Sequence, residues 1–206
     1  TLEIGIGRLG AAVLARLGDR RRLAVHAGLV ADGVLDLVDA GAVTGGITTG
    51  VAVGSEAFER RAAGHPAIRF RPIAHTHDAA VLAGLPRFTA VNFALEVDLY
   101  GQVNAERLGA RLAGGRGGLG DFSRGARRSA GGRAIVALAA TAGAGRLSRI
   151  VPALSPGPVS LAHGEVDFVV TENGVADLRQ VSRETCAERL IAIADPAARP
   201  GLGGGG

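Results

Sequence analysis

Three glycines near the start of the chain have the spacing of a phosphate-binding turn. Gly5-x-Gly7-x-x-Gly10 stands between an apolar run at 2–6, predicted as a strand, and a helical pattern at 11–17. Backbone N–H groups at the start of such a helix point outward, and the helix dipole favours an anion there. We therefore expect this turn to hold a small phosphate-bearing ligand.

Two other interpretations of this turn stay open. A Rossmann-type dinucleotide-binding domain would need an acidic residue at the end of the second strand to hold the ribose. That strand is predicted at Leu23–His26 and is followed by Ala27 and Gly28, whereas Asp32 comes later and is predicted to cap the next helix. A glycine turn can also serve only to let a helix and a strand pack closely.

A second glycine-rich segment, residues 114–120, could also surround an anion. It reads Gly-Gly-Arg-Gly-Gly-Leu-Gly and is followed by Asp121. Successive glycine amides can form an anion-binding nest and let a ligand approach the backbone closely. We expect Gly114, Gly117 and Gly118 to contact the ligand; the alternative is a surface loop that binds nothing.

The histidines and isolated acids give weaker signals for chemistry. His75-Thr-His77-Asp78 has the ligand types that zinc prefers, but no further His or Cys lies nearby, so we predict a solvated loop and no metal site. His26, at the predicted strand end, is either a structural or a catalytic side chain. Glu172 precedes Asn173-Gly174 and is either a turn-anchoring carboxylate or an acid of the site. Cys186 falls in a helical pattern and is predicted to be a buried apolar residue.

The elements that must position these residues alternate between strands and helices. A chain of 206 residues with 47% hydrophobic residues can bury one large core. The order strand, glycine turn, helix, strand, helix predicts an α/β fold with a parallel sheet covered by helices. We expect one domain at 1–198 and a flexible glycine-rich tail at 199–206. Further strands are predicted at 51–53, 68–70, 89–91, 134–138, 150–151, 159–161 and 166–170, a hairpin around Gly101, and helices at 56–63, 79–84 and 184–194.

Composition narrows the class of protein. The formal net charge is +4, and all 23 basic residues are arginine. Aromatic residues make up 3% of the chain, which is too few for the stacking surface of a nucleic-acid-binding protein. No leader pattern and no apolar run of about 18 residues is present, so we expect no membrane segment. The single cysteine fits a reducing, cytoplasmic location. Because Thr1 opens directly into an apolar run, we expect the chain to be a fragment that begins near a strand.

Ordered blocks along nearly the whole chain resemble the C-terminal half of the acetyl-CoA hydrolase/transferase family. The matching stretches are Gly5-Ile-Gly7, Asp32–Gly41, Val91–Asn104, Gly117-Gly118 with Asp121-Phe122, Gly131–Leu138, Ser148–Pro152 and Val166–Ala176. The resemblance implies a CoA-transferase-type α/β sheet covered by helices, as one half of a two-domain protein whose preceding half is absent here. It also implies acyl-CoA and small carboxylic acids as substrates, no permanently bound cofactor, and a symmetric homo-oligomer.

The resemblance also implies a mechanism and a set of contacts. In the family, a glutamate attacks the acyl-CoA thioester and releases CoA, which gives an acyl anhydride. CoA then attacks the glutamyl carbonyl of the anhydride and releases the carboxylic acid, which gives a glutamyl-CoA thioester that passes CoA to the acceptor acid. Backbone amides stabilise the oxyanions. The expected CoA contacts are Gly5, Ile6, Gly7, Ala94, Leu95, Gly114, Gly117, Gly118 and Arg133.

One position departs from the family pattern. The nucleophilic glutamate is expected just after the second strand, where this chain reads His26-Ala-Gly28-Leu-Val-Ala-Asp32-Gly. Gly28 therefore occupies the glutamate position, and glycine cannot form an anhydride. His26, Glu96 and Glu172 are the remaining candidates for chemistry. Three hypotheses follow: an enzyme that uses another group or an activated water, a non-catalytic acyl-CoA-binding homologue, and a Rossmann-type domain.

Overall fold

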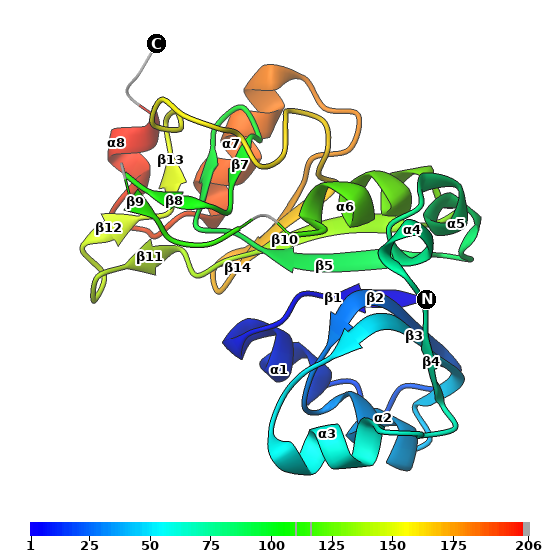
Figure 1. Cartoon of the computed structure of the whole chain (residues 1–206). Coiled ribbons are helices and arrows are strands. Elements are labelled where there is room, and N and C mark those ends of the chain that lie inside the picture. Colours follow the sequence, from blue (N-terminus) through cyan, green and yellow to red (C-terminus); the bar gives the residue numbers. More distant parts are fainter. Residues whose placement is uncertain (110, 116, 204–206) are drawn as a thin grey trace. The chain divides into compact units, whose positions relative to one another are not determined.

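A computed structural model describes residues 1–109, 111–115 and 117–203 (Figure 1). The chain forms two compact units. Unit 1 contains Thr1–Val91 and Arg124–Arg133, and unit 2 contains Asn92–Ser123 and Ala134–Gly206. Each unit has its own buried hydrophobic cluster.

Unit 1 alternates strands and helices, as the sequence predicts. Its elements are β1 (Leu2–Ile4), α1 (Arg8–Leu14), β2 (Leu23–Val30), α2 (Val34–Asp39), β3 (Val43–Ala52), α3 (Glu56–Ala62), β4 (Ile68–Phe70), α4 (Ile73–Thr76), α5 (Ala79–Gly84) and the start of β5 (Thr89–Phe93). The strands pair in the order β5-β1-β2-β3-β4, and every pair is parallel. Parallel strands need crossover connections, which the helices supply. The carboxyl ends of these strands therefore lie at one edge of the sheet, where α/β proteins bind their ligands.

The helices of unit 1 cover both faces of this sheet. The buried cluster on one face joins β2 and β3 to α2 and α3 through residues such as Leu35, Ile47 and Phe58. The helices α4 and α5 lie on the other face (Figure 1). On that face Gly125 of α6 (Leu119–Arg128) passes close to α5, because a Cβ atom there would lie 2.5 Å from the Cβ of Leu82.

Local sequence explains where several helices begin. Asp78 precedes α5, and its carboxylate accepts hydrogen bonds from the amides of Ala80 and Val81. Ser55 precedes α3, and its hydroxyl accepts from the amide of Phe58 at 3.2 Å. Such caps satisfy N–H groups that have no partner within the helix.

Unit 2 is built from shorter strands. They are β6 (Glu96–Asp98), β7 (Val103–Asn104), β8 (Arg107–Leu108), β9 (Arg111–Leu112), β10 (Arg133–Ala137), β11 (Thr141–Ala142), β12 (Leu147–Ser148), β13 (Ile150–Val151), β14 (Phe168–Thr171) and β15 (Gly174–Asp177). Strand β10 pairs with β14 in parallel, and β14 forms a hairpin with β15. A second sheet has the order β13-β6-β7. Helix α7 (Arg183–Ile193) buries Cys186 and Leu190 in the cluster of this unit.

The structure confirms most predicted elements. The strand predicted at 51–53 is part of β3, which spans Val43–Ala52, and four further predictions about strands and helix ends are corrected. The hairpin around Gly101 and the strand at 134–138 are confirmed. The second strand continues to Val30, so Gly28 lies inside it. The predicted strand at 159–161 is reduced to a single bridge from Leu161 to Val103.

The other two corrections concern helix ends. Asp32 is not a helix cap, because α2 begins after Gly33 without a side-chain cap. Residues Arg199–Gly203, predicted as part of a flexible tail, form the short helix α8 because Leu202 packs into the buried cluster of unit 2. Residues 204–206 lie outside the described part of the chain, and the domain boundary at 198 stays a prediction. In the described residues, every helix is too short or too polar to cross a membrane.

Candidate functional site

The glycine turn after β1 is set up by a backbone conformation that only glycine adopts readily. Gly7 has φ 111° and ψ −176°, a region essentially restricted to glycine. The Gly5 amide donates to the Val91 carbonyl at 2.8 Å and so holds the turn to β5. The amides of Ile6 and Gly7 donate to no other group in the described part of the chain. These two N–H groups are therefore available to a ligand.

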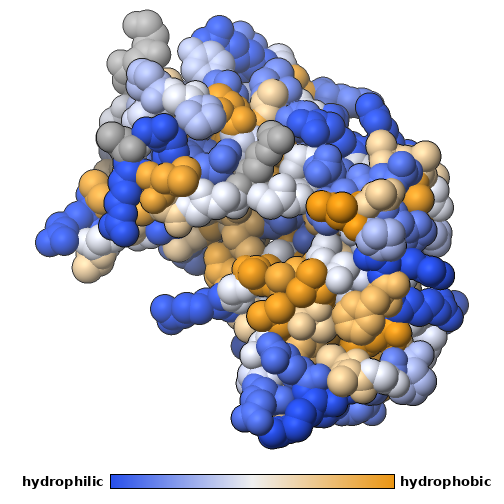
Figure 2. Space-filling model, viewed as in Figure 1, coloured by the Kyte–Doolittle hydropathy of each residue, from blue (hydrophilic) through white to orange (hydrophobic). Residues whose placement is uncertain are grey.

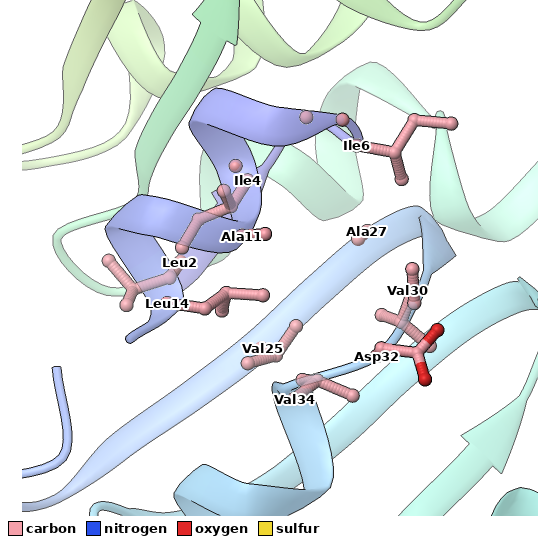
Figure 3. Close-up of a pocket in the computed structure, with 14 residues that line it drawn as sticks. Leu2, Ile4, Ile6, Ala11, Leu14, Val25, Ala27, Val30, Asp32 and Val34 are labelled. Carbon is pink, nitrogen blue, oxygen red and sulfur yellow. The ribbon is translucent and has the colours of Figure 1, made fainter. Parts of the chain in front are cut away.

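An apolar cavity lies directly behind this turn (Figure 3). It has a volume of about 190 Å³ and is lined by β1, the turn, α1, β2 and the residues that lead into α2. Figure 3 shows the side chains of Leu14, Val25 and Val34 around the same space. At its mouth Ile6 is 57% exposed. Apolar side chains are also gathered on the visible surface of unit 1 (Figure 2).

Asp32 is the only charged residue among those that line the cavity. Its two carboxylate oxygens accept from the amide and the hydroxyl of Ser55, at 2.9 and 2.5 Å. These hydrogen bonds hold the pKa of Asp32 below its usual value. A side chain at Gly54 would overlap the same carboxylate, so Gly54 is required by this close approach.

This geometry changes the case against a dinucleotide site. Because β2 ends at Val30, an acid does follow the second strand closely, in contrast to our expectation from the sequence. That acid is Asp32, whose two oxygens already accept hydrogen bonds from Ser55, so a ribose would have to share them.

His26 lies in the middle of β2 and is buried. Its Nε2 is 3.1 Å from the Thr76 carbonyl oxygen, and its ring lies 5.8 Å from that of His75 and edge-on to Phe88. A carbonyl can only accept a hydrogen bond, so Nε2 carries the proton of the neutral ring. Burial lowers the pKa of His26, the Thr76 hydrogen bond opposes this shift, and His75 and His77 add to it. These contacts favour the structural interpretation of His26.

Gly28 follows on the same strand and faces the same side of the sheet as His26, because residues two apart in a strand share a face. Its neighbours Ala27 and Leu29 pair with Thr49 and Val51 of β3. Gly28 is half-buried and does not have a positive φ, so a residue with a side chain can adopt this backbone conformation.

A basic hollow lies on this face of unit 1. Thr48, Arg69, Arg71, Pro72 and His75 line a shallow space of about 570 Å³. In the part of the chain that is described, neither arginine makes an ion pair. These two arginines were not predicted as site residues. Arg69 lies in the predicted strand at 68–70 and Arg71 directly follows that strand, so the available signal was their spacing of two residues along an extended chain, which favours one face.

Residues 75–78, predicted as a solvated loop, include the end of helix α4 (Ile73–Thr76), and Thr76 is buried. No group of three or more His, Cys, Asp or Glu residues that could hold a metal occurs in the described residues. Asp78 is occupied as a helix cap, and His77 Nδ1 lies 2.9 Å from the Thr76 hydroxyl.

The remaining predicted contacts belong mostly to unit 2. The amide of Ala94 donates to Ala137 and that of Leu95 to Asn104, so these two N–H groups are occupied within the protein. The amide of Gly114 donates to the Glu106 carbonyl at 3.2 Å.

At the other end of the loop, Gly117 has φ 50°, and the carbonyl of Gly118 accepts from the Phe122 amide in the first turn of α6. Asp121 stands inside that first turn and does not precede the helix. Arg116, in the middle of the predicted nest, lies outside the described residues.

Two of the three candidate acids or bases also belong to unit 2, and both have structural partners. Glu96 accepts from the side-chain amide of Asn104 at 2.8 Å. Glu172 accepts from the backbone amide of Ala140 at 2.8 Å, which supports its interpretation as a turn anchor. Arg133, in unit 1, is exposed at the start of β10.

Comparison with known proteins decides the family. The sequence model described as "Acetyl-CoA hydrolase/transferase C-terminal domain" matches residues 54–204. This chain belongs to the acetyl-CoA hydrolase/transferase family. The match begins after the glycine turn and Gly28, but individual relatives align with those residues too, because they cover up to 98% of the chain.

Several relatives of this acetyl-CoA hydrolase/transferase domain have known activities. The 4-hydroxybutyrate coenzyme A transferase of Clostridium kluyveri is 36% identical over 98% of this chain and 49% of its own length. The butyryl-CoA:acetate CoA-transferase of Anaerostipes caccae is 34% identical over 98% of this chain and 48% of its own length. The chain thus spans about half the length of the relatives that it matches.

Solved structures agree with this assignment. RipA from Yersinia pestis has a TM-score of 0.92 and 33% identity, over 98% of this chain and 47% of that one. The 4-hydroxybutyrate CoA-transferase from Porphyromonas gingivalis has a TM-score of 0.86 and 35% identity, over 98% and 49%. The expected CoA-transferase-type α/β fold is therefore confirmed.

Proposed function

We propose that this chain is the acyl-CoA-binding C-terminal domain of a protein that transfers CoA between an acyl-CoA and a carboxylic acid, or hydrolyses the thioester. One observation carries the proposal. In a chain of this family, the amides of Ile6 and Gly7, at the carboxyl edge of a parallel sheet, have no hydrogen-bond partner among the described residues. Fixed N–H groups of this kind can bind a phosphate or the carbonyl oxygen of a thioester.

The covalent route of the family needs a carboxylate where this chain has Gly28. A glycine cannot form the acyl anhydride, so the chain itself would not form a glutamyl-CoA thioester. Turnover would then require another group. His26, Glu96 and Glu172 are the candidates, and each already has one hydrogen-bond partner within the protein.

The glycine at position 28, where the family has a glutamate, also favours a second function for the same site. A homologue that binds acyl-CoA without turning it over would need the turn and no free acid or base. The Rossmann-type alternative is less well supported, because Ser55 occupies both oxygens of Asp32.

The partners and location follow from the family and are proposals here. The relatives are about twice as long as this chain, which supports a second half of the same protein as its first partner. We further propose a symmetric homo-oligomer, a cytoplasmic location, no resident cofactor, and Arg133 as a contact for the CoA phosphates. Light scattering on the full-length protein would test the oligomeric state.

A calorimetric titration of acetyl-CoA into the full-length protein, with free thiol measured on the same sample, tests the main proposal. Binding with thiol release would support a hydrolase, or a transferase if release needs an acceptor acid. Binding without thiol release, both with and without an acceptor acid, would support the non-catalytic homologue. If acetyl-CoA does not bind, the proposed function is wrong.

A further inference from the structure

The cavity behind the glycine turn owes its space to small residues. Gly10 and Ala11 of α1, Ala27 of β2 and Ala31, which precedes α2, are all among its lining residues. A larger side chain at any of these positions would enter the space. The cavity therefore lies between α1 and the sheet of unit 1, where small side chains leave space (Figure 3).

The lining of this cavity selects against polar ligands. Asp32 carries the only charge on its wall, and its oxygens already accept from Ser55. A carboxylate inside the cavity would lose its hydration and meet the negative charge of Asp32, and a hydroxyl there would find no side-chain partner besides Asp32, so both are disfavoured against an apolar group. An apolar group loses no hydrogen bonds to water when it enters the cavity, and its transfer from water is favourable.

The volume limits the size of that apolar group. Apolar cavities of roughly 150 Å³ stay dry and bind a molecule the size of benzene, which has about six carbons. A cavity of about 190 Å³ accommodates a chain of similar carbon number. The pantetheine arm of CoA does not suit it, because that arm carries two amides that would need hydrogen-bond partners.

The position of the mouth connects the cavity to the proposed ligand. The residues at the mouth are Ile6 and Gly7, whose amides are free to bind a carbonyl or phosphate oxygen. A thioester held at these amides would have its acyl chain beside an apolar opening.

We propose that the cavity of unit 1 binds the acyl chain of an acyl-CoA, and that the preferred acyl group is saturated, unsubstituted and about four to six carbons long. This inference rests on the proposed function. It adds a substrate class: chains that end in a hydroxyl or a carboxylate are excluded.

The test measures binding of S-alkyl thioethers of CoA, which cannot be cleaved as thioesters, to the full-length protein by calorimetry. We expect the affinity to rise about fourfold with each methylene added from S-ethyl to S-hexyl, because this is the gain expected for burying one methylene fully. An S-(4-hydroxybutyl) thioether should bind more weakly than the S-butyl thioether.

Ala11→Leu and Ala27→Leu fill the cavity from opposite walls and should remove the dependence of affinity on chain length while free CoA still binds. Ala12→Leu is the matched control, because Ala12 lies on the same helix, is exposed and does not line the cavity.

Two outcomes would overturn the inference, and they can be told apart. If CoA thioethers bind but all chain lengths bind equally, or the filled variants keep the dependence, the cavity does not hold the acyl chain and the proposed function still stands. If neither the thioethers nor free CoA bind, both proposals fail.

Discussion

Gly28 is the residue on which the proposed chemistry depends. It lies inside β2, on the strand face shared with His26, and its backbone conformation is open to other residues. The ring of His26 lies 5.8 Å from that of His75, which lines the basic hollow.

We predict that Gly28→Glu creates or raises CoA-transferase activity by roughly 10²-fold, the lower end of what a positioned catalytic group supplies. The reason is that a carboxylate can form the acyl anhydride that glycine cannot. The measurement is transfer of CoA from butyryl-CoA to acetate. Gly28→Gln is the matched control, since it has the same size without the carboxylate. Equal rates in the two variants would contradict the prediction.

His26 should make the stability of the protein depend on pH. Burial lowers its pKa in the folded protein, so between the lowered pKa and about 6.5 the unfolded chain binds a proton that the folded protein does not. The stability that this residue supplies is complete above about pH 6.5 and falls as the pH drops below that value.

We therefore predict that the free energy of unfolding falls between pH 7 and pH 5, and that His26→Gln flattens this fall. Glutamine keeps an N–H donor for the Thr76 carbonyl but does not titrate. Urea unfolding at several pH values measures the effect. His163→Gln, at an exposed position, is the comparison variant for the loss of a histidine outside the buried core. A slope that is the same in His26→Gln as in the wild type would show that other groups cause it.

At the scale of elements, the glycine turn between β1 and α1 combines a backbone conformation that is restricted to glycine with the proposed ligand contact. Gly7→Ala adds a Cβ that touches nothing within 4 Å, so its cost comes from the backbone at φ 111° alone. We predict a loss of about 1–3 kcal/mol in the free energy of unfolding. We also expect weaker binding of acetyl-CoA, because the Ile6 and Gly7 amides change direction.

The control for this turn is Gly18→Ala, which also has open space around its Cβ position and no positive φ. It should keep both stability and binding within error. Thermal unfolding and calorimetry together separate the two effects. If the Gly7→Ala protein is destabilised but binds acetyl-CoA normally, the turn is not part of the acetyl-CoA site.

The elements also show which parts of the fold the sequence could and could not predict. The first strand, turn and helix were predictable because apolar runs and glycines mark them locally. The extension of β2 to Val30 was not, because glycine weakens a strand pattern and pairing with β3 overrides that weakness. The partner of Asp32 is Ser55, 23 residues away, and no local pattern indicates such a contact. Helix α8 forms in a Gly/Pro-rich run because Leu202 is buried, which is a tertiary effect.

At the scale of the whole molecule, the family was easier to predict than the site. Ordered blocks spread over most of the chain carry the family resemblance, and a substitution in any one block leaves the rest intact. A site depends on a few atoms. The predicted contacts at Ala94 and Leu95 illustrate this, because their amides are already bonded to Ala137 and Asn104, and only the folded backbone reveals it.

The whole chain should also respond to the ligand that it binds. A ligand that binds only the folded state stabilises it by RT ln(1 + [L]/Kd), which is about 2.7 kcal/mol at a hundredfold excess over Kd. For a chain of 206 residues we therefore predict that acetyl-CoA raises the midpoint of thermal unfolding by about 5–10 °C. NADH at the same concentration should leave the midpoint unchanged, because Ser55 occupies the carboxylate that would hold a ribose. If NADH raises the midpoint of thermal unfolding and acetyl-CoA does not, the CoA-binding hypothesis is contradicted, and the result favours a dinucleotide site at the glycine turn.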